Sequence, residues 1–361
     1  MCQYASESGG PTDFHLVHLG KFAMGGAGIV FCEETSVEER GRKSYHCAGI
    51  YDDSHIPGYR RINDFIRSQG AIPAIQIGHS GRKGSGSSPW EGYRPLTGDD
   101  ARAGNPPWQT VSASAVAAAS APPPQALELA EIAAVIAHWR EAALRAIDAG
   151  YDIVEVHAAH GYLIHQFLSP ITNLRTDAYG GNLQGRMRLC LEIVEAVRAV
   201  WPDDRPVFMR VSAVDGLNSR WSVEDTIALV NAAKERGAEV VTTSSGGING
   251  PGTATLVPRV PGYHVPYSER VRREAGVKTI AVGLITDAQQ AEDILQRGEA
   301  DLIALARELL WNPNWPVHAA RTLGVSDHLE MLPRAYAWWL QRREAIREVT
   351  REAAQRGDDN R

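Results

Sequence analysis

The sequence contains little cysteine and no long apolar run. Its 361 residues include only four cysteines, Cys2, Cys32, Cys47 and Cys190, and no two of them form a CxxC pair. We therefore expect neither a disulfide framework nor a zinc or iron–sulfur site built from thiolates. No apolar stretch approaches the ~20 residues of a membrane span, and no signal peptide is evident. These absences predict a cytoplasmic protein without a membrane partner.

The sequence also lacks an excess of positive charge. It has 37 Lys and Arg residues against 43 Asp and Glu residues, which gives a formal net charge of -6. Nucleic acids and anionic membranes attract basic surfaces, so this balance predicts neither as a partner. The composition, 43% hydrophobic and 22% charged, is typical of a globular protein with a sizeable core.

Short apolar runs alternate with amphipathic helical segments, which is the pattern of parallel βαβ units. The runs are apolar throughout, as expected of strands buried on both faces. The seven clearest are Gly28–Glu33, Ala74–His79, Asp152–His157, Val207–Ser212, Glu239–Ser244, Thr279–Gly283 and Asp301–Ala306. Ala126–Ala149 is the clearest helix. Predicted helices are followed by candidate C-cap glycines at Gly70, Gly150, Gly237 and Gly298.

This repetition predicts an α/β protein with one closed (β/α)8 barrel, a TIM barrel. Because such a barrel needs eight strands, Met1–Tyr4 is interpreted as the C-terminal tip of a first strand, and Thr12–Gly25 as the first helix. Most of the first strand is then expected to be missing. Residues 1–340 are predicted to form one domain, and residues 341–361 a charged helix and tail. The alternative is a doubly wound open sheet, but no GxGxxG motif follows an early strand.

Two segments interrupt the alternation. Ser80–Pro124 is rich in Gly, Ser, Pro and Ala and directly follows a predicted strand. It is predicted to be a long loop on the catalytic face, where it would shape the choice of substrate. Gly246–Pro266 is predicted to be a second loop of this kind.

Active sites of barrels lie at the C-terminal ends of the strands, so polar residues there are candidates. His157 and His160 follow one strand, and their neutral N–H groups could hold a carbonyl or nitro oxygen. Tyr162 could then supply a proton. Metal ligation and a structural role remain open for the same histidine pair, although no convergent carboxylate is near in sequence.

A second set of strand ends predicts a phosphate site. Gly246 and Gly283 follow two late strands, and Arg307 follows the last one. Backbone N–H groups and a guanidinium at these positions suit phosphate oxygens, although glycines there also serve turns. Arg210 ends another strand, and arginine is rarely buried without a partner. An electron-rich ring or a carboxylate such as Glu33 would provide one.

Several longer motifs together resemble the Old Yellow Enzyme-type NAD(P)H:flavin oxidoreductases, in particular the bacterial branch often called thermophilic-like or YqjM-like. The resemblance runs from Met1 to about residue 320, and it implies that an N-terminal lid is missing together with most of the first strand. The motifs are MCQY (Met1–Tyr4), IQIGHSGRK (Ile75–Lys83), HAAHGYLIHQFLSP with NLRTDAYGGN (His157–Asn182), MRVS (Met209–Ser212) and AVGLITD with DLIALARELL (Ala281–Leu310).

The resemblance implies an ene-reductase in which NADPH or NADH reduces FMN and a small activated alkene, such as an enone, is then reduced in the same pocket. Residues 1–340 would be the FMN-binding domain of a homo-oligomer, a dimer or tetramer. His157 and His160 would hold the carbonyl oxygen of the substrate. Tyr162 would protonate its α-carbon, and Tyr4 would assist binding. No metal is implied. Contacts to FMN would come from Met1, Cys2, Glu34, Gln76, Arg210, Gly246, Gly283, Ala306 and Arg307.

Within this set, Gln76 and Arg210 would bind the flavin pyrimidine, and Cys2 would lie near N5. The FMN phosphate would be held by Gly283, Ala306 and Arg307. Glu34 is a departure, because its position is usually small in the family and lies close to the flavin. Two other hypotheses remain: a truncated relative with impaired flavin binding, and a metal-dependent barrel lyase or hydrolase that uses the HxxH motif.

Overall fold

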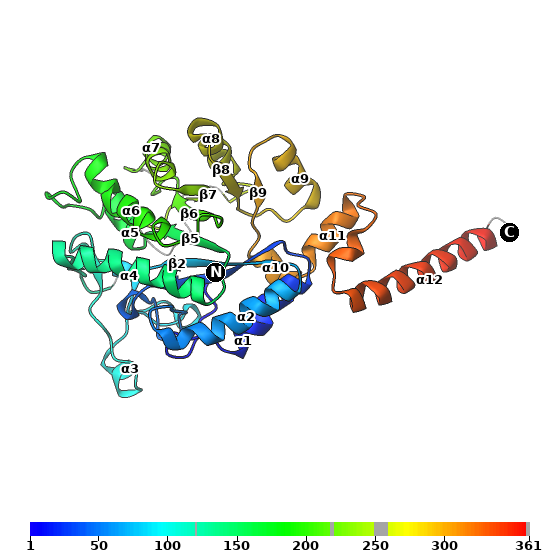
Figure 1. Ribbon diagram of the computed structural model, residues 1–361, viewed down its shortest axis with the longest axis horizontal. Helices are drawn as coiled ribbons and strands as arrows, with labels where there is room; N and C mark the ends of the chain where they lie inside the picture. The colour runs from blue at the N-terminus through cyan, green and yellow to red at the C-terminus, as the bar shows by residue number, and fades with distance from the viewer. Residues whose placement is uncertain (120, 217–219, 249–258, 359–361) are drawn as a thin grey trace.

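The computed structural model describes residues 1–361 except residue 120 and the segments 217–219, 249–258 and 359–361. The described residues contain a curled parallel sheet of seven strands in the order β1-β2-β5-β6-β7-β8-β9 (Figure 1). The strands are β1 (Ile29–Ser36), β2 (Ile72–Gly78), β5 (Ile153–Ala158), β6 (Val207–Ser212), β7 (Ala238–Ser244), β8 (Lys278–Ala281) and β9 (Leu302–Ile303). All seven strands predicted from the sequence are therefore present.

Helices connect these strands and surround the sheet, as Figure 1 shows. The helix α1 (Asp13–Met24) precedes β1, and the connecting helices are α2 (Ile56–Ser68), α4 (Leu129–Asp148), α6 (Leu183–Arg198), α7 (Val223–Lys234), α8 (Val265–Ala275) and α9 (Ala288–Gln296). Shorter helices follow β5 and β9: α5 (Leu163–Leu168), α10 (Arg307–Trp311) and α11 (Trp315–Thr322). Parallel strands with helical crossovers are the arrangement of a TIM-barrel-like α/β fold.

Burial explains why these segments fold as they do. Every residue of β5 is buried, so an apolar run without alternation suits a strand covered on both faces. The helix α4 turns Ile132, Val135 and Trp139 toward the sheet, and all three are fully buried. The predicted C-cap glycines have positive φ values: 84° at Gly70, 83° at Gly150, 93° at Gly237 and 68° at Gly298. Only glycine adopts this conformation at little cost.

The N-terminal residues differ from the prediction. Residues 1–4 are not in a strand, and β1 and β9 each pair with only one neighbour in the described part of the sheet. The N-terminal segment instead lies beside the C-terminal part of β1 and the residues that follow this strand. The Gln3 amide donates to the Glu33 carboxylate at 2.7 Å, and the Ser6 amide donates to the His46 carbonyl at 3.1 Å.

The segment Ser80–Pro124 is more ordered than a plain loop. It contains the short helix α3 (Gly98–Arg102) and the strand β3 (Val111–Ser112), which pairs in parallel with β4 (Gln125–Ala126). Two-residue strands carry no readable periodicity, so the sequence pattern could not reveal them. Part of the second predicted loop, residues 249–258, lies outside the described residues.

The C-terminal helix α12 (Arg334–Asp358) begins earlier than predicted, so the expected boundary at residues 340–341 falls within it. It extends away from the body of the molecule (Figure 1). Tyr336, Trp338 and Trp339 on this helix are 52%, 45% and 66% exposed. These aromatic side chains therefore do not pack into the protein's own core.

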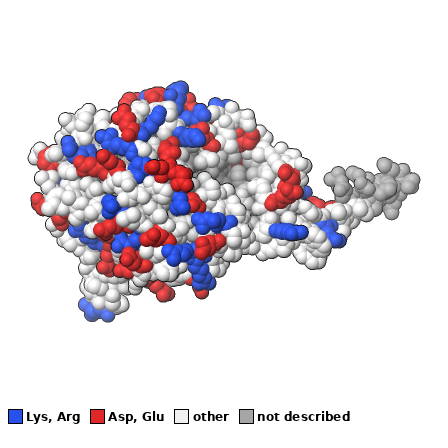
Figure 2. Space-filling view, viewed as in Figure 1, with Lys and Arg blue, Asp and Glu red and all other residues white. Residues whose placement is uncertain are grey.

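The surface carries both signs of charge. Figure 2 shows acidic and basic side chains interspersed over the visible face of the body, without a large region of one sign. Within the described residues, no helix combines the length and the apolar character needed to cross a membrane.

Candidate active site

The predicted site residues from β2, β5 and β6 lie next to one another because their strands are neighbours in register. Gln76 pairs with Glu155, and His157 pairs with Arg210. Parallel strands present their C-terminal ends at one edge of the sheet, so these side chains share one end of the barrel. The sequence-based placement of Gln76, His157 and Arg210 at strand ends agrees with this geometry.

A buried carboxylate, Glu155, organises the floor of this site. Gln76 Nε2 donates to Glu155 Oε1, and Thr242 Oγ1 donates to Glu155 Oε2, both at 2.6 Å. Burial lowers the pKa of Arg210, and the negative charge of Glu155 opposes that shift. Arg210 Nε is buried and has no hydrogen-bond partner among the described residues. A ligand with acceptor atoms would therefore satisfy it.

Glu33 is not the partner of Arg210. Its carboxylate accepts from the Gln3 amide and lies 3.4 Å from His15 Nε2. The register between β1 and β2 shifts between Cys32 and Glu34, which marks a bulge at Glu33. A bulge turns an extra side chain toward the interior, so both Glu33 and Glu34 are buried.

The two histidines of the HxxH motif are brought together. His160 Nδ1 lies 3.3 Å from His157 Nε2, and His160 Nε2 lies 2.8 Å from Ser244 Oγ. Burial first, and the nearby Arg210 charge second, lower the pKa of both imidazoles well below the usual value. Both rings are therefore neutral near pH 7. His157 Nδ1 has no partner among the described residues and is available to a ligand.

The segment that carries the histidines is held in an uncommon conformation. His160 has a φ of 60°, and its amide donates to Ser212 Oγ at 3.0 Å. Gly161 and Gly247 approach so closely that a Cβ on Gly161 would collide with the Gly247 carbonyl. Glycine is thus required where the loops after β5 and β7 meet. The histidine pair has a structural role here in addition to any role in binding.

Tyr162 lies beside the histidines, with its ring centre 5.2 Å from that of His157. Two ammonium groups face this ring: Lys43 Nζ at 5.2 Å and Lys83 Nζ at 5.6 Å from its centre. Burial, and then the charge of Arg82, lower the pKa of Lys83 to about 7. Lys83 Nζ also donates to the His160 carbonyl at 2.8 Å.

The remaining predicted substrate and flavin-ring residues line the same end. Glu34 forms a buried ion pair with Lys43, and Cys2 Sγ lies 3.9 Å from Glu34 Oε2. Burial raises the pKa of Cys2 to about 12, so it is a thiol at neutral pH. Tyr4 contacts Trp90 edge to face at 5.7 Å, which brings the segment Ser80–Pro124 to the site. Met1, by contrast, is 53% exposed.

The predicted phosphate residues lie at the ends of later strands. Gly283 has a φ of 114°, and a Cβ there would come within 3.2 Å of Tyr263 and His264. Ala306 and Arg307 are exposed where α10 begins, and no hydrogen bond or ion pair joins the Arg307 side chain to other described residues. The Gly246 amide donates to the Val214 carbonyl at 2.7 Å, so its N–H group is already used.

Taken together, the residues present fit an FMN group. Arg210 and Gln76 offer polar atoms from the floor of the site, where a planar ring with carbonyl and imide groups would meet them. Gly283 leaves space for a close approach of the backbone, and Arg307 offers an uncommitted guanidinium to a phosphate. In the described part of the chain, no group of three or more His, Cys, Asp and Glu side chains could hold a metal ion. The metal-dependent hypothesis therefore lacks a ligand set there.

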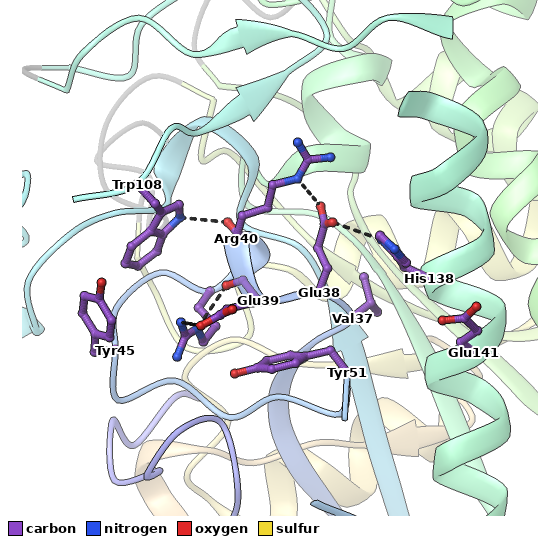
Figure 3. Close-up of a pocket in the computed structure, with 10 residues that line it drawn as sticks. Val37, Glu38, Glu39, Arg40, Tyr45, Tyr51, Trp108, His138 and Glu141 are labelled. Carbon is purple, nitrogen blue, oxygen red and sulfur yellow. Dashed lines mark hydrogen bonds and ion pairs between the residues drawn. The ribbon is translucent and has the colours of Figure 1, made fainter. Parts of the chain in front are cut away.

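A separate cavity of about 610 Å³ lies between α4 and the segment after β1 (Figure 3). Glu38 is at its centre. Burial opposes ionisation of Glu38, but hydrogen bonds from His79 Nε2 at 2.6 Å and Arg40 Nε at 2.9 Å lower its pKa to about 2. His79 Nδ1 accepts the Gly81 amide at 2.9 Å, so Nε2 carries the proton. This chain of contacts fixes the turn that leads to Lys83.

Sequence reasoning missed three charged residues of the site: Glu155, Lys43 and Lys83. Glu155 had a signal, because it is the one carboxylate inside the apolar run IVEVH. A buried carboxylate needs partners, and that alone marks it as part of a network. Lys43 had no comparable signal, since it lies in a polar segment without periodicity.

Comparisons with known proteins agree with this geometry. The model of the NADH:flavin oxidoreductase / NADH oxidase family matches residues 1–325. NADPH dehydrogenase of Geobacillus thermodenitrificans (strain NG80-2) is 39% identical over 328 residues, covering 90% of this chain and 89% of that protein. The structure of morphinone reductase matches with a TM-score of 0.73 at 26% identity, over 89% of this chain and 84% of that one.

A structure of 2-naphthoyl-CoA reductase with 2-naphthoyl-CoA shares the fold, with a TM-score of 0.79 at 24% identity. The match covers 89% of this chain but 49% of that one, so this chain spans about half its length. Fold and site thus define an NAD(P)H-dependent flavin oxidoreductase that uses FMN. The chain belongs to the NADH:flavin oxidoreductase / NADH oxidase family, and the predicted Old Yellow Enzyme relationship is confirmed.

Proposed function

We propose that this protein reduces electron-poor carbon–carbon double bonds, such as those of enones and related activated alkenes. The reaction has two half-reactions in one pocket, with NADPH or NADH as the first substrate and the alkene as the second. FMN, when bound, supplies the hydride chemistry that links them. Gln76 and Arg210 would hold its pyrimidine, Cys2 and Glu34 would lie beside the ring, and Gly283, Ala306 and Arg307 would hold its phosphate.

The histidine pair would bind the carbonyl oxygen of the alkene. Both imidazoles are neutral, so an N–H that they donate brings no positive charge that would trap an anion. His160 contacts His157 and Ser244 through its two nitrogens, so it would have to exchange one of these contacts to bind the substrate. His157 Nδ1 has no partner among the described residues. Donors aimed at a carbonyl oxygen stabilise the negative charge that develops there when the β-carbon accepts a hydride.

Tyr162 would complete the reduction by donating its phenolic proton to the α-carbon. Its ring lies against His157 and His160, at 5.2 and 6.4 Å between ring centres. Burial raises its pKa, so the proton is present at neutral pH. Tyr4, which contacts Trp90 and lies near Tyr162, would confine the substrate from the opposite side.

The observation that carries this proposal is the meeting of two neutral imidazoles and a phenol above a buried Arg210 with an unpartnered Nε. Such a set offers an oxyanion site and a proton donor beside a place for an electron-rich ring. Ser244 Oγ lies 2.8 Å from His160 Nε2, but the other nitrogen of that imidazole contacts His157, whereas a hydrolytic triad would place a carboxylate there.

Replacing Tyr162 by Phe tests the assignment of the acid. In the FMN-loaded protein, we expect Tyr162→Phe to keep its rate of reduction by NAD(P)H and to react with cyclohexenone about 10² to 10⁴ times more slowly. Rapid mixing under anaerobic conditions measures the two steps separately. Full alkene turnover by this variant would remove Tyr162 from the role of acid.

A further inference from the structure

The ion pair between Lys43 and Glu34 is buried at the mouth of the proposed substrate site. Lys43 is 7% exposed and Glu34 is 5% exposed, and Lys43 Nζ donates to Glu34 Oε2. Glu34 belongs to β1, whereas Lys43 lies in the segment between β1 and α2. The pair is thus held by two parts of the chain that the fold brings together.

Stability is a poor explanation for this pair. Removing two charges from water is costly, and a buried pair seldom stabilises a protein more than well-packed apolar residues would. The pair is also incompletely satisfied, because Glu34 Oε1 is buried without a hydrogen-bond partner among the described residues. Because burying this ion pair costs free energy, its presence is better explained by the groups that its charges contact.

Lys43 faces Tyr162. Its Nζ lies 5.2 Å from the centre of the Tyr162 ring, which is within the range of a cation–π contact. Lys83 Nζ lies at 5.6 Å from the same centre, but burial and Arg82 lower its pKa to about 7. Burial opposes the charge of Lys43, yet the carboxylate of Glu34 beside it raises its pKa well above the usual value. Lys43 therefore stays charged throughout the neutral range, whereas Lys83 does not.

We propose that Lys43, anchored by Glu34, is a positioning residue that holds a fixed positive charge against Tyr162 and favours the phenolate left when Tyr162 donates its proton. The inference rests on the proposed role of Tyr162 as the acid of alkene reduction. In that step the O–H bond of Tyr162 breaks, a C–H bond forms at the α-carbon, and the phenolate recovers a proton from water.

The other charged and titratable groups around Tyr162 do not replace Lys43. Burial raises the pKa of Tyr162, the charge of Lys43 lowers it, and the carboxylate of Glu34 raises it, while the thiols of Cys2 and Cys47 nearby are uncharged. The neutral imidazoles of His157 and His160 contact the ring edge to face. The further groups that face this cluster are Lys83, Tyr4 and Arg210. Lys43 is the permanent cation within contact of the ring among the described residues.

The test removes both charges together, so that no unpaired charge is left in the site. The double variant Lys43→Gln with Glu34→Gln is compared with the wild-type protein, both loaded with FMN. The same double variant is also made in the Tyr162→Phe background and compared there with Tyr162→Phe alone. Lys43→Met with Glu34→Leu is a second neutral double variant, whose apolar side chains fill a volume similar to that of the ion pair. It is used if the variant with two glutamines does not fold. Lys43→Arg keeps the charge. Arg272→Met with Asp301→Asn removes an ion pair of 3.0 Å far from Tyr162 and serves as the control.

We expect the neutral pairs to slow the reaction of the reduced protein with cyclohexenone by up to about tenfold, since one pKa unit changes proton donation by no more than that factor. The solvent isotope effect on this step should rise, and the dissociation constant of the enone should not change. The rate of reduction by NAD(P)H is measured separately, because Glu34 is proposed to lie beside the flavin ring. Lys43→Arg should keep most of the wild-type rate.

The double-mutant cycle decides the outcome. If Lys43 acts through Tyr162, the neutral pairs have no further effect in the Tyr162→Phe background. An effect of the same size in both backgrounds, or an unchanged isotope effect, overturns the role of Lys43 while Tyr162 remains the acid. If Tyr162→Phe alone leaves the alkene step unchanged, the proposed acid and this inference fail together.

Discussion

The central strands of the sheet, at the substrate end of the site, and its last strands, at the phosphate end of the site, differ in length and burial. At the substrate end, every residue of β5 is buried, and β6 pairs with β7 along its whole length. At the phosphate end, β9 has two residues, and Leu302 is 38% exposed. The helix α10, which begins with Arg307, buries none of its residues.

This difference indicates that the two halves of the site are preorganised for ligand binding to different degrees. The histidine pair, Tyr162 and Arg210 are held by long ladders and buried hydrogen bonds before any ligand binds. The residues proposed to bind phosphate have few apolar contacts, which is typical of segments that a ligand stabilises. We therefore expect FMN to order the end formed by β8, β9 and α10 more than the end formed by β5 and β6.

The largest expected effect is on stability at the substrate end. Ile75 of β2 is fully buried, so Ile75→Ala should lower the free energy of unfolding by about 2–5 kcal/mol. Leu302→Ala, at a position 38% exposed, should cost only about 0.5 kcal/mol. Urea unfolding of the FMN-free variants measures both. Equal losses would show that the two ends are equally packed.

The second effect concerns ligand binding at the substrate end. Replacing His157 and His160 together by alanine removes both oxygen-binding donors, so the affinity for a phenol should fall by about 10² to 10³. Titration of the charge-transfer band that a phenol forms with bound FMN measures this loss. Binding of FMN itself should be preserved, and a phenol affinity equal to that of wild type would rule out the oxyanion site.

The third effect concerns the phosphate end. Arg307→Ala should weaken FMN binding by about 10- to 100-fold, because a charge-assisted hydrogen bond contributes about 1.5–3 kcal/mol. The stability of the FMN-free protein should not change, since Arg307 is exposed and joined to no other described residue. Arg273→Ala, another exposed arginine, is the matched control. Fluorescence titration with FMN distinguishes them, and equal affinities would place the phosphate elsewhere.

The smallest expected effect is a pH dependence of the free energy of unfolding, which arises from one residue at the substrate end. His165 is fully buried, and burial, followed by the charge of Lys83, lowers its pKa to about 3. Between about pH 6.5 and 3 the unfolded chain binds a proton that the folded chain does not, so stability falls as the pH falls through this range. From pH 7 to pH 5 this group should cost about 2 kcal/mol.

His165→Asn tests this prediction, because an asparagine oxygen can still accept the Gly161 amide that His165 Nδ1 accepts at 2.8 Å. The variant should lose less stability than wild type between pH 7 and pH 5 in urea unfolding. A parallel decline in both proteins would show that His165 is not responsible for the acid sensitivity.

The same contrast explains how much the sequence could predict. Strands buried on both faces leave continuous apolar runs, so all seven were located, and the polar residues at their ends led to His157, Arg210 and Gln76. Contacts between residues that are far apart in the sequence produce no such local pattern. Lys43 reaches Tyr162 and Glu34 only because the segment after β1 folds back over the strand ends, which no local pattern encodes.

The weaker predictions fall where local structure is short. Residues 1–4 were expected to form a strand tip, but their hydrogen bonds go to side chains such as Glu33. Gly246 is predicted to contact the cofactor; its amide donates to the Val214 carbonyl, so a contact through its other atoms stays a prediction. Hydrogen bonds of this kind follow no helical or strand period, so sequence periodicity contains no information about them.

The most direct test of the central claim is the visible spectrum of the FMN-loaded protein through one anaerobic cycle. The account predicts that NADPH or NADH bleaches the flavin absorbance and that cyclohexenone restores it with formation of cyclohexanone. Bleaching without recovery on addition of cyclohexenone or another activated alkene would contradict the proposed reduction of carbon–carbon double bonds.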